Sequence, residues 1–154
     1  MIKLLPRNVK EWSISPEGVQ AAYEQAFNIA GQNWWQKLIS RLAGIQSPFY
    51  FAEAGYEPVD EAVLSDILAK DTTDKQQYVT DWYDCDDFAF RLMGAFHQDK
   101  RAELWPIFIT WVILPEGGHA VLSYYKDGEV KIIEPQNDQV FPVPEDWTLY
   151  LLCG

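Results

Sequence analysis

The dipeptide Asp127-Gly128 lies between two short runs of strand-forming residues, and it constrains the fold more than any other feature of the sequence. Asp-Gly is favoured in the two-residue type I′ turn that joins antiparallel strands. The flanking runs, residues 119–126 and 129–134, are therefore predicted to form a hairpin in which Lys126 faces Glu129. Side chains alternate between the two faces of a strand. One face of this hairpin is then expected to carry His119, Val121, Glu134 and Gln136.

Other runs extend the predicted sheet and place a helix before it. Residues 105–114 are apolar, β-branched and aromatic, as expected of a strand that is buried on both faces. Residues 147–152 are predicted to add another strand. Upstream of these strands, apolar residues recur at the spacing of one helical face. That face consists of Cys85, Phe88, Ala89, Leu92, Met93 and Phe96.

The first half of the chain has mainly helical patterns. Ser15 followed by Pro16 is typical of a helix start, and the apolar spacing after it predicts a helix over residues 16–42. Residues 45–51 contain a proline and no helical period, so we expect them to cross the surface. A second helix is predicted over residues 61–70, before a run of residues that prefer turns.

These patterns predict an α+β fold in a single domain, because 154 residues suit one compact core. Residues 1–80 are expected to be mainly helical. Residues 81–154 are expected to pack the helix that begins at Cys85 against an antiparallel sheet.

The charge balance limits the partners that the chain can bind. It has 23 acidic and 12 basic residues, and its formal net charge of −11 repels nucleic-acid backbones and anionic membranes. No window approaches the ~18 apolar residues of a membrane-spanning helix, and the start of the sequence lacks the apolar core of a signal peptide. We therefore expect a cytoplasmic protein that binds neither nucleic acid nor membranes. The sequence does not indicate an oligomeric state.

Cys85 and His119 are the residues with the clearest chemical potential. Cys85 is predicted in the first turn of its helix, where unpaired N–H groups and the helix dipole favour a thiolate. The two aspartates that follow it oppose that effect. In the predicted register Glu134 is a diagonal neighbour of His119, within reach of the imidazole. A thiol, an imidazole and a carboxylate in this order are typical of a nucleophile, its base and the group that orients the base.

Three motifs carry a family resemblance: Asp84-Cys85-Asp86-Asp87-Phe88-Ala89, Gly118-His119-Ala120-Val121-Leu122 and Glu134-Pro135. They resemble the papain-like and transglutaminase-like cysteine peptidase superfamily, in particular bacterial transglutaminase-like cysteine proteinases and the C-terminal protease domain of fungal agglutinins. The resemblance covers residues 81–135. It implies a papain-like/transglutaminase-like fold, with Cys85 as nucleophile, His119 as general base and Glu134 as orienting group.

The oxyanion hole is where the sequence departs from papain, which has a glutamine six positions before the nucleophile. That position here is Val79, so we expect the backbone N–H of Cys85 to be one donor and a second to come from the preceding residues. The candidates for this second donor are Gln77, ranked first, Trp82 and Tyr83. Gln136 is the alternative to Glu134 as the group that orients His119.

Metal binding is a further expectation that the resemblance brings. Calcium activates the agglutinin enzymes, which makes it a candidate cofactor here, although none is required. Four carboxylates offer the hard oxygen ligands that calcium prefers, at Asp81, Asp84, Asp86 and Asp87. A zinc site made of Cys85, His119 and one acid is the alternative, but hard carboxylates with one thiolate make a poor zinc set.

The chemistry expected of these residues is acyl transfer by a cysteine peptidase or amidase acting on a peptide or protein substrate. The thiolate attacks the carbonyl carbon, and the imidazole protonates the departing amine. Transglutaminase-type transfer follows if an amine replaces water. The alternative from another class is a catalytically inactive papain-like module that binds a protein or a sugar through an aromatic surface, to which Trp34 and Trp35 belong.

Overall fold

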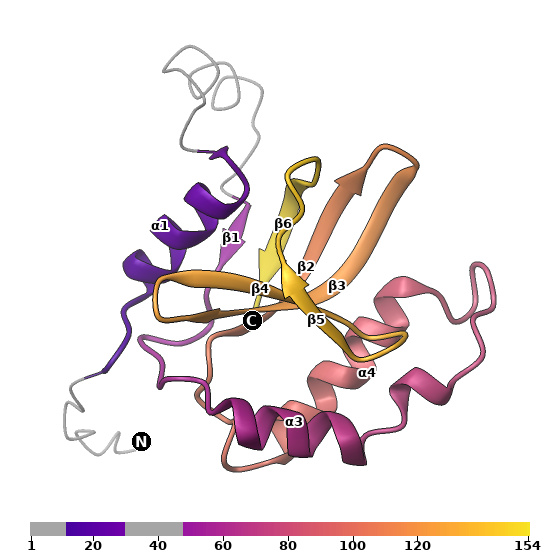
Figure 1. Ribbon diagram of the computed structural model, residues 1–154, viewed down its shortest axis with the longest axis horizontal. Helices are drawn as coiled ribbons and strands as arrows, with labels where there is room; N and C mark the ends of the chain where they lie inside the picture. Colours follow the sequence, from indigo (N-terminus) through magenta and orange to yellow (C-terminus); the bar gives the residue numbers. More distant parts are fainter. Residues whose placement is uncertain (1–11, 30–47) are drawn as a thin grey trace, which may run out of the picture.

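The structure, a computed structural model, describes residues 12–29 and 48–154. In these residues a six-stranded sheet with the order β1-β6-β2-β3-β4-β5 forms the central layer. Helices α3 and α4 cover one face, and α1 covers the other (Figure 1). The fold is therefore a mixed α+β fold with three layers. The strands are β1 (Phe49–Tyr50), β2 (Ile107–Leu114), β3 (Gly117–Lys126), β4 (Glu129–Glu134), β5 (Gln139–Pro142) and β6 (Thr148–Cys153).

The hairpin of β3 and β4 has the predicted register. Lys126 pairs with Glu129, and Leu122 pairs with Ile133. Asp127 and Gly128 have φ values of 51° and 90°, the positive values that a type I′ turn requires at both central positions. No bulge shifts this pairing, so His119 and Glu134 remain diagonal neighbours, as the sequence predicted.

Helix α1 (Pro16–Ala26) begins where the sequence predicts but is shorter than the predicted helix over 16–42. The Ser15 hydroxyl accepts a hydrogen bond from the backbone N–H of Gly18 at 3.2 Å. The helix stops because Asn28 adopts the left-handed conformation, with φ of 53°. Residues 30–47, which include Trp34 and Trp35, lie outside the described residues.

Two helices coincide with their predictions. Helix α3 (Glu61–Lys70) is capped by Asp60, whose carboxylate accepts from the N–H groups of Ala62 and Val63. Helix α4 (Cys85–Gln98) has Asp84 as its N-cap, and its buried face consists of Phe88, Ala89, Leu92, Met93 and Phe96. The short 3-10 helix η2 (Thr73–Lys75) lies between them. No helix in the described parts of the chain is long and apolar enough to cross a lipid bilayer.

The sheet corrects three sequence-based boundaries. Residues 45–51 were expected to cross the surface, but β1 pairs with β6 in parallel. A two-residue strand has no periodicity that a sequence pattern could reveal. β5 was not predicted, and β2 starts at Ile107 because Trp105 belongs to a preceding turn. The sheet is therefore antiparallel except at the β1–β6 pair.

Two apolar layers hold the helices to the sheet. One lies between the sheet and α3 and α4, and the other lies between the sheet and α1. The second layer contains a buried polar chain. The Tyr23 hydroxyl lies 2.7 Å from the Ser123 hydroxyl, which in turn lies 2.5 Å from that of Thr110. These side chains are fully buried, so the hydroxyls of Tyr23 and Ser123 depend on this chain for hydrogen bonding, while Thr110 also donates to the carbonyl of Phe108 at 3.3 Å.

Candidate functional site

An open cleft of about 320 Å³ lies where the start of α4 meets β2, β3 and β6. Its volume is at the lower end of the ~300–1,000 Å³ range of small-molecule sites. The exposed lining is mainly apolar, with polar groups from the helix start and from β3. The lining residues are Cys85, Asp86, Trp111, Val112, Ile113, Gly118, His119 and Tyr150.

The side chains of His119 and Glu134 form the polar pair at this cleft. The imidazole Nε2 of His119 lies 2.7 Å from Oε2 of Glu134, and the two side chains are 16% and 14% exposed. The other carboxylate oxygen, Oε1, accepts a hydrogen bond from the backbone N–H of Gln136 at 3.2 Å. The ring of Trp147 packs edge-on against the imidazole, with the two ring centroids 6.3 Å apart. These contacts fix the imidazole, and the predicted contact between His119 and Glu134 is confirmed.

Cys85 lies in the cleft lining, but its surroundings do not favour a thiolate. Burial raises the pKa of Cys85, and the nearby carboxylates of Asp84 and Asp86 raise it further. The backbone N–H of Ala120, next to His119 on β3, faces the sulfur and offsets part of this rise. The helix start was expected to promote ionisation. Here burial and the two acids outweigh it, and the thiolate is disfavoured.

The four carboxylates proposed for calcium do not converge on one point. Ligand atoms of Asp84, Cys85 and Asp86 lie within 4.8 Å of one another, and this is the one such group in the described residues. Asp87 instead accepts a hydrogen bond from the backbone N–H of Asp84 at 3.2 Å. The side-chain contact with Asp84 raises the pKa of Asp86, and partial burial raises it further. Two carboxylates therefore fit a hard cation, whereas the thiol does not.

The predicted donors to an oxyanion lie away from the cleft lining. Gln77 is exposed, and the Trp82 side chain is 84% exposed. Tyr83 instead packs its ring against Phe88, with ring centroids 4.8 Å apart. Gln136 contacts Glu134 through its backbone rather than orienting the imidazole through its side chain. Among the described residues, none of these four lines the cleft.

The aromatic wall of the cleft was not predicted from the sequence. On β2, Trp111 pairs with Leu151, while the next residue, Val112, pairs with Leu149. Tyr150 is thus the extra residue of a bulge in β6, and its side chain is 67% exposed. Bulges re-aim side chains beside functional sites. Phe90 on α4, which is 54% exposed, meets Trp111 edge-on at 6.0 Å and extends this wall.

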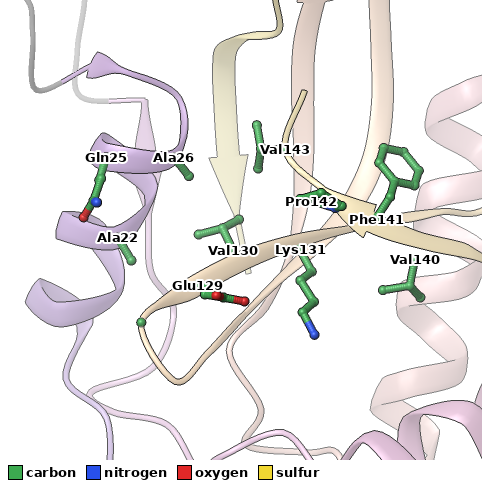
Figure 2. Close-up of a pocket in the computed structure, with 11 residues that line it drawn as sticks. Ala22, Gln25, Ala26, Glu129, Val130, Lys131, Val140, Phe141, Pro142 and Val143 are labelled. Carbon is green, nitrogen blue, oxygen red and sulfur yellow. The ribbon is translucent and has the colours of Figure 1, made fainter. Parts of the chain in front are cut away.

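A larger cavity of about 590 Å³ lies elsewhere, between α1 and the strands β4 and β5, at the end of the sheet where β5 is the edge (Figure 2). Its walls come from Ala22 and Ala26 on one side and from residues around Val130 and Phe141 on the other. Its one cationic lining side chain, Lys131, already pairs with Glu61 at 2.9 Å. None of the candidate site residues predicted from the sequence lines this cavity.

Comparison with known proteins identifies structural neighbours. No family model and no curated protein matches the chain. A solved structure titled "PSL1a-E64 complex" superposes with a TM-score of 0.61 at 20% identity, covering 80% of this chain and 51% of that one. A structure of Polyporus squamosus lectin bound to the epitope Neu5Aca2-6Galb1-4GlcNAc superposes with a TM-score of 0.62 at 18% identity. The match covers 69% of this chain and 42% of that one. The chain thus spans about half the length of these proteins and shares their fold.

These neighbours correct the functional expectations drawn from the sequence. PSL1a is itself the Polyporus squamosus lectin, so both structures are of a lectin, and no matching family supports a cysteine peptidase or amidase. The expected papain-like peptidase family, thiol-dependent acyl transfer, transamidation and a peptide substrate are therefore set aside. The raised pKa of Cys85 points the same way, because a thiol attacks as the thiolate and burial and nearby acids disfavour that form.

Proposed function

We propose that this chain is a carbohydrate-binding module and that its sugar site is the cleft at the start of α4. The observation that carries the proposal is the composition of the cleft. A mainly apolar lining of a space of about 320 Å³ includes the imidazole of His119, which Glu134, outside the lining, holds at 2.7 Å. A sugar ring presents apolar C–H faces and a rim of hydroxyl groups, and it needs both kinds of surface.

The polar groups of the cleft suit hydroxyl recognition. The imidazole of His119 is held by Glu134 through Nε2, so one tautomer and one ring orientation are favoured. The Asp86 carboxyl group, at the start of α4, is a further lining group with acceptor oxygens. Hydroxyl groups both donate and accept, so a sugar can use both the imidazole and this carboxyl group. In this role Cys85 supplies a small, weakly polar floor rather than a nucleophile.

The aromatic side chains supply the stacking surface. Tyr150 is mostly exposed on its bulge, and Trp111 lies beside it on β2. Exposed aromatic rings rimmed by polar groups mark ligand-binding grooves in globular proteins. The rings of Trp111 and Tyr150 are thus placed to cover the apolar face of one sugar ring.

The structural neighbours support a binding role but do not assign the sugar. Polyporus squamosus lectin was solved with a sialylated trisaccharide, and this chain corresponds to about half of that protein. Its ligand therefore does not transfer directly to the cleft described here. The packing of a helix start against a largely antiparallel sheet is kept as a proposal of papain-like architecture, without its activity. A cytoplasmic location likewise stays a prediction.

A glycan microarray probed with the purified chain tests the proposal, followed by calorimetric titration of the glycans that bind. Tyr150→Ala is expected to weaken binding about threefold to tenfold, because aromatic contacts contribute ~0.5–1.5 kcal/mol beyond their buried area. His119→Ala should weaken it further by removing a fixed polar partner.

Tyr50→Ala is the matched control, since Tyr50 is also exposed, at 49%, and lies on β1 outside the cleft lining. Binding by this variant should equal that of the wild type. If no glycan binds, or if Tyr150→Ala and Tyr50→Ala weaken binding equally, the cleft is not a sugar site.

A further inference from the structure

A glycine lies in the lining of the cleft, at a strand position that a residue with a side chain would stabilise. Gly118 is the second residue of β3 and lines the cleft beside His119. Glycine weakens a strand, because it loses more conformational freedom on folding than any other residue and has no side chain to pack. It usually marks an irregularity such as a bulge, or a point where another backbone or a ligand comes close.

The conformation of Gly118 does not require glycine. Its φ lies outside the positive range, in contrast to that of Gly117, which is 146°. The pairing of β2 with β3 is also regular at this point, because Ile113 faces Gly118 and Leu114 faces Gly117 without a shift. A left-handed conformation and a bulge are therefore both excluded at position 118.

A Cβ atom added to Gly118 would enter open space. Apart from its two chain neighbours, no heavy atom of the described residues lies within 4 Å of that position. Side chains alternate along a strand, so this Cβ would share a face with Ala120 and Leu122, which belong to the apolar layer under α4. Cys85 and Trp111 pack against the same layer and also line the cleft. The space beside Gly118 is therefore part of the cleft, and no neighbouring backbone occupies it.

The backbone groups of Gly118 also face away from β2. The pair that closes the two-residue turn, at Lys126, exchanges hydrogen bonds across the hairpin, so the even-numbered residues of β3 direct their N–H and C=O groups toward β4. β4 pairs with β3 no further than Leu122, and at Ala120 the N–H faces the Cys85 sulfur instead. Gly118 lies beyond both positions and is exposed, so its N–H and C=O groups are open to a ligand.

We propose that Gly118 is a contact residue of the sugar site, where one edge of the bound sugar ring lies against the β3 backbone in the space that a side chain would fill. This inference rests on the proposed carbohydrate-binding function and adds a size limit to it. One sugar hydroxyl donates to the C=O of Gly118 and another accepts from its N–H, since hydroxyl groups do both. A side chain at position 118 competes with the sugar ring for the same space.

Gly118→Ala and Gly118→Val test the inference on a glycan microarray that carries neutral and sialylated glycans, with calorimetric titration of those that bind the wild type. Gly118→Ala should weaken binding on the order of tenfold, because one carbon too many in a close-fitting site typically changes affinity by about 10-fold to 200-fold. Gly118→Val should abolish binding, since valine fills more of the space while it favours the strand conformation.

Gly94→Ala is the matched control, because a Cβ at Gly94 also meets open space beyond its own helix, and Gly94 lies on α4 outside the cleft lining. This variant should bind glycans as the wild type does. Without glycan, both alanine variants should raise the melting temperature by about 1–4 °C, because each lowers the conformational entropy of the unfolded chain without strain in the folded one.

Two results would overturn the role of Gly118 while the cleft remains a sugar site. One is wild-type affinity in the folded Gly118→Val variant, and Gly118→Ala decides in its place if the valine variant does not fold. The other is a melting temperature that falls in Gly118→Ala and rises in Gly94→Ala, because the glycine would then have a structural reason. If the wild type itself binds no glycan on the array, the proposed function fails, and the inference fails with it.

Discussion

The buried hydroxyl chain beneath α1 gives a quantitative prediction for Tyr23→Phe. Phenylalanine keeps the ring contacts, including the edge-on contact with Phe108 at 5.7 Å, and removes only the hydroxyl that lies 2.7 Å from Ser123. Ser123 retains Thr110 as a partner, so one hydrogen bond is lost and no second hydroxyl is orphaned. We expect the free energy of unfolding to fall by about 1 kcal/mol, the typical net value of such a bond.

Ser123→Ala should be more costly than Tyr23→Phe, because it removes the central hydroxyl of the chain. Tyr23 then loses this partner without replacement, and Thr110 keeps only its longer contact, at 3.3 Å, to the carbonyl of Phe108. The expected loss is about 2–3 kcal/mol, since orphaned buried hydroxyls carry their full desolvation cost. In the double variant the Tyr23 hydroxyl is absent, so its total loss should be smaller than the sum of the two by about 1 kcal/mol.

Urea unfolding at pH 7, followed by tryptophan fluorescence, measures these differences as shifts in midpoint at constant slope. Tyr150→Phe is the control, since its hydroxyl belongs to an exposed side chain and its removal should change stability by less than ~0.5 kcal/mol. The reasoning is refuted if Tyr23→Phe behaves like this control, or if the losses from Tyr23→Phe and Ser123→Ala are additive.

Three further predictions concern the cleft. Burial and nearby acids raise the pKa of Cys85, so mass spectrometry should show that iodoacetamide labels it more slowly than free cysteine at pH 7. Rapid labelling at pH 5–6 that is lost in His119→Ala would contradict this prediction and indicate a reactive thiolate. Calcium at millimolar concentration should raise the melting temperature of the wild type by about 2–4 °C but not that of Asp86→Asn, and a flat wild-type response would remove calcium as a ligand. On a microarray, a sialylated glycan should bind on the order of tenfold more weakly than its neutral counterpart. The described cleft lining includes the carboxylate of Asp86 and no lysine or arginine, so it repels a negatively charged sugar. Equal binding of the two glycans would exclude this charge effect.

Local patterns predicted the hairpin and two of the helices well, because their determinants are local. The Asp127-Gly128 turn sets the register of β3 and β4, and that register alone brings His119 to Glu134. Helices α3 and α4 follow from apolar spacing and an aspartate cap at each start. The end of α1 could not be foreseen, since it depends on the left-handed conformation of Asn28.

The aromatic residues that line the cleft could not be predicted from local sequence patterns, because pairing between distant strands brings them together. Tyr150 reaches the cleft through a bulge opposite Trp111 and Val112, and no local signal marks an extra residue in β6. The ionisation of Cys85 was also decided by tertiary burial rather than by its place at a helix start. The resemblance of short motifs around Cys85 and His119 located these residues but predicted a chemistry that the structural neighbours do not support.

The order of the strands has a consequence for how the chain reaches this fold. β1 precedes every other strand of the described sheet in sequence, yet it pairs there with β6, which follows all of them and inserts between β1 and β2. The hydroxyl contact between α1 and β3 spans 100 residues of sequence as well. Contacts of such long range slow folding, because a large loop must close before they form. During translation the apolar face of α1 therefore stays uncovered until the strands that pack against it have been made, and β1 cannot pair before β6 has been made.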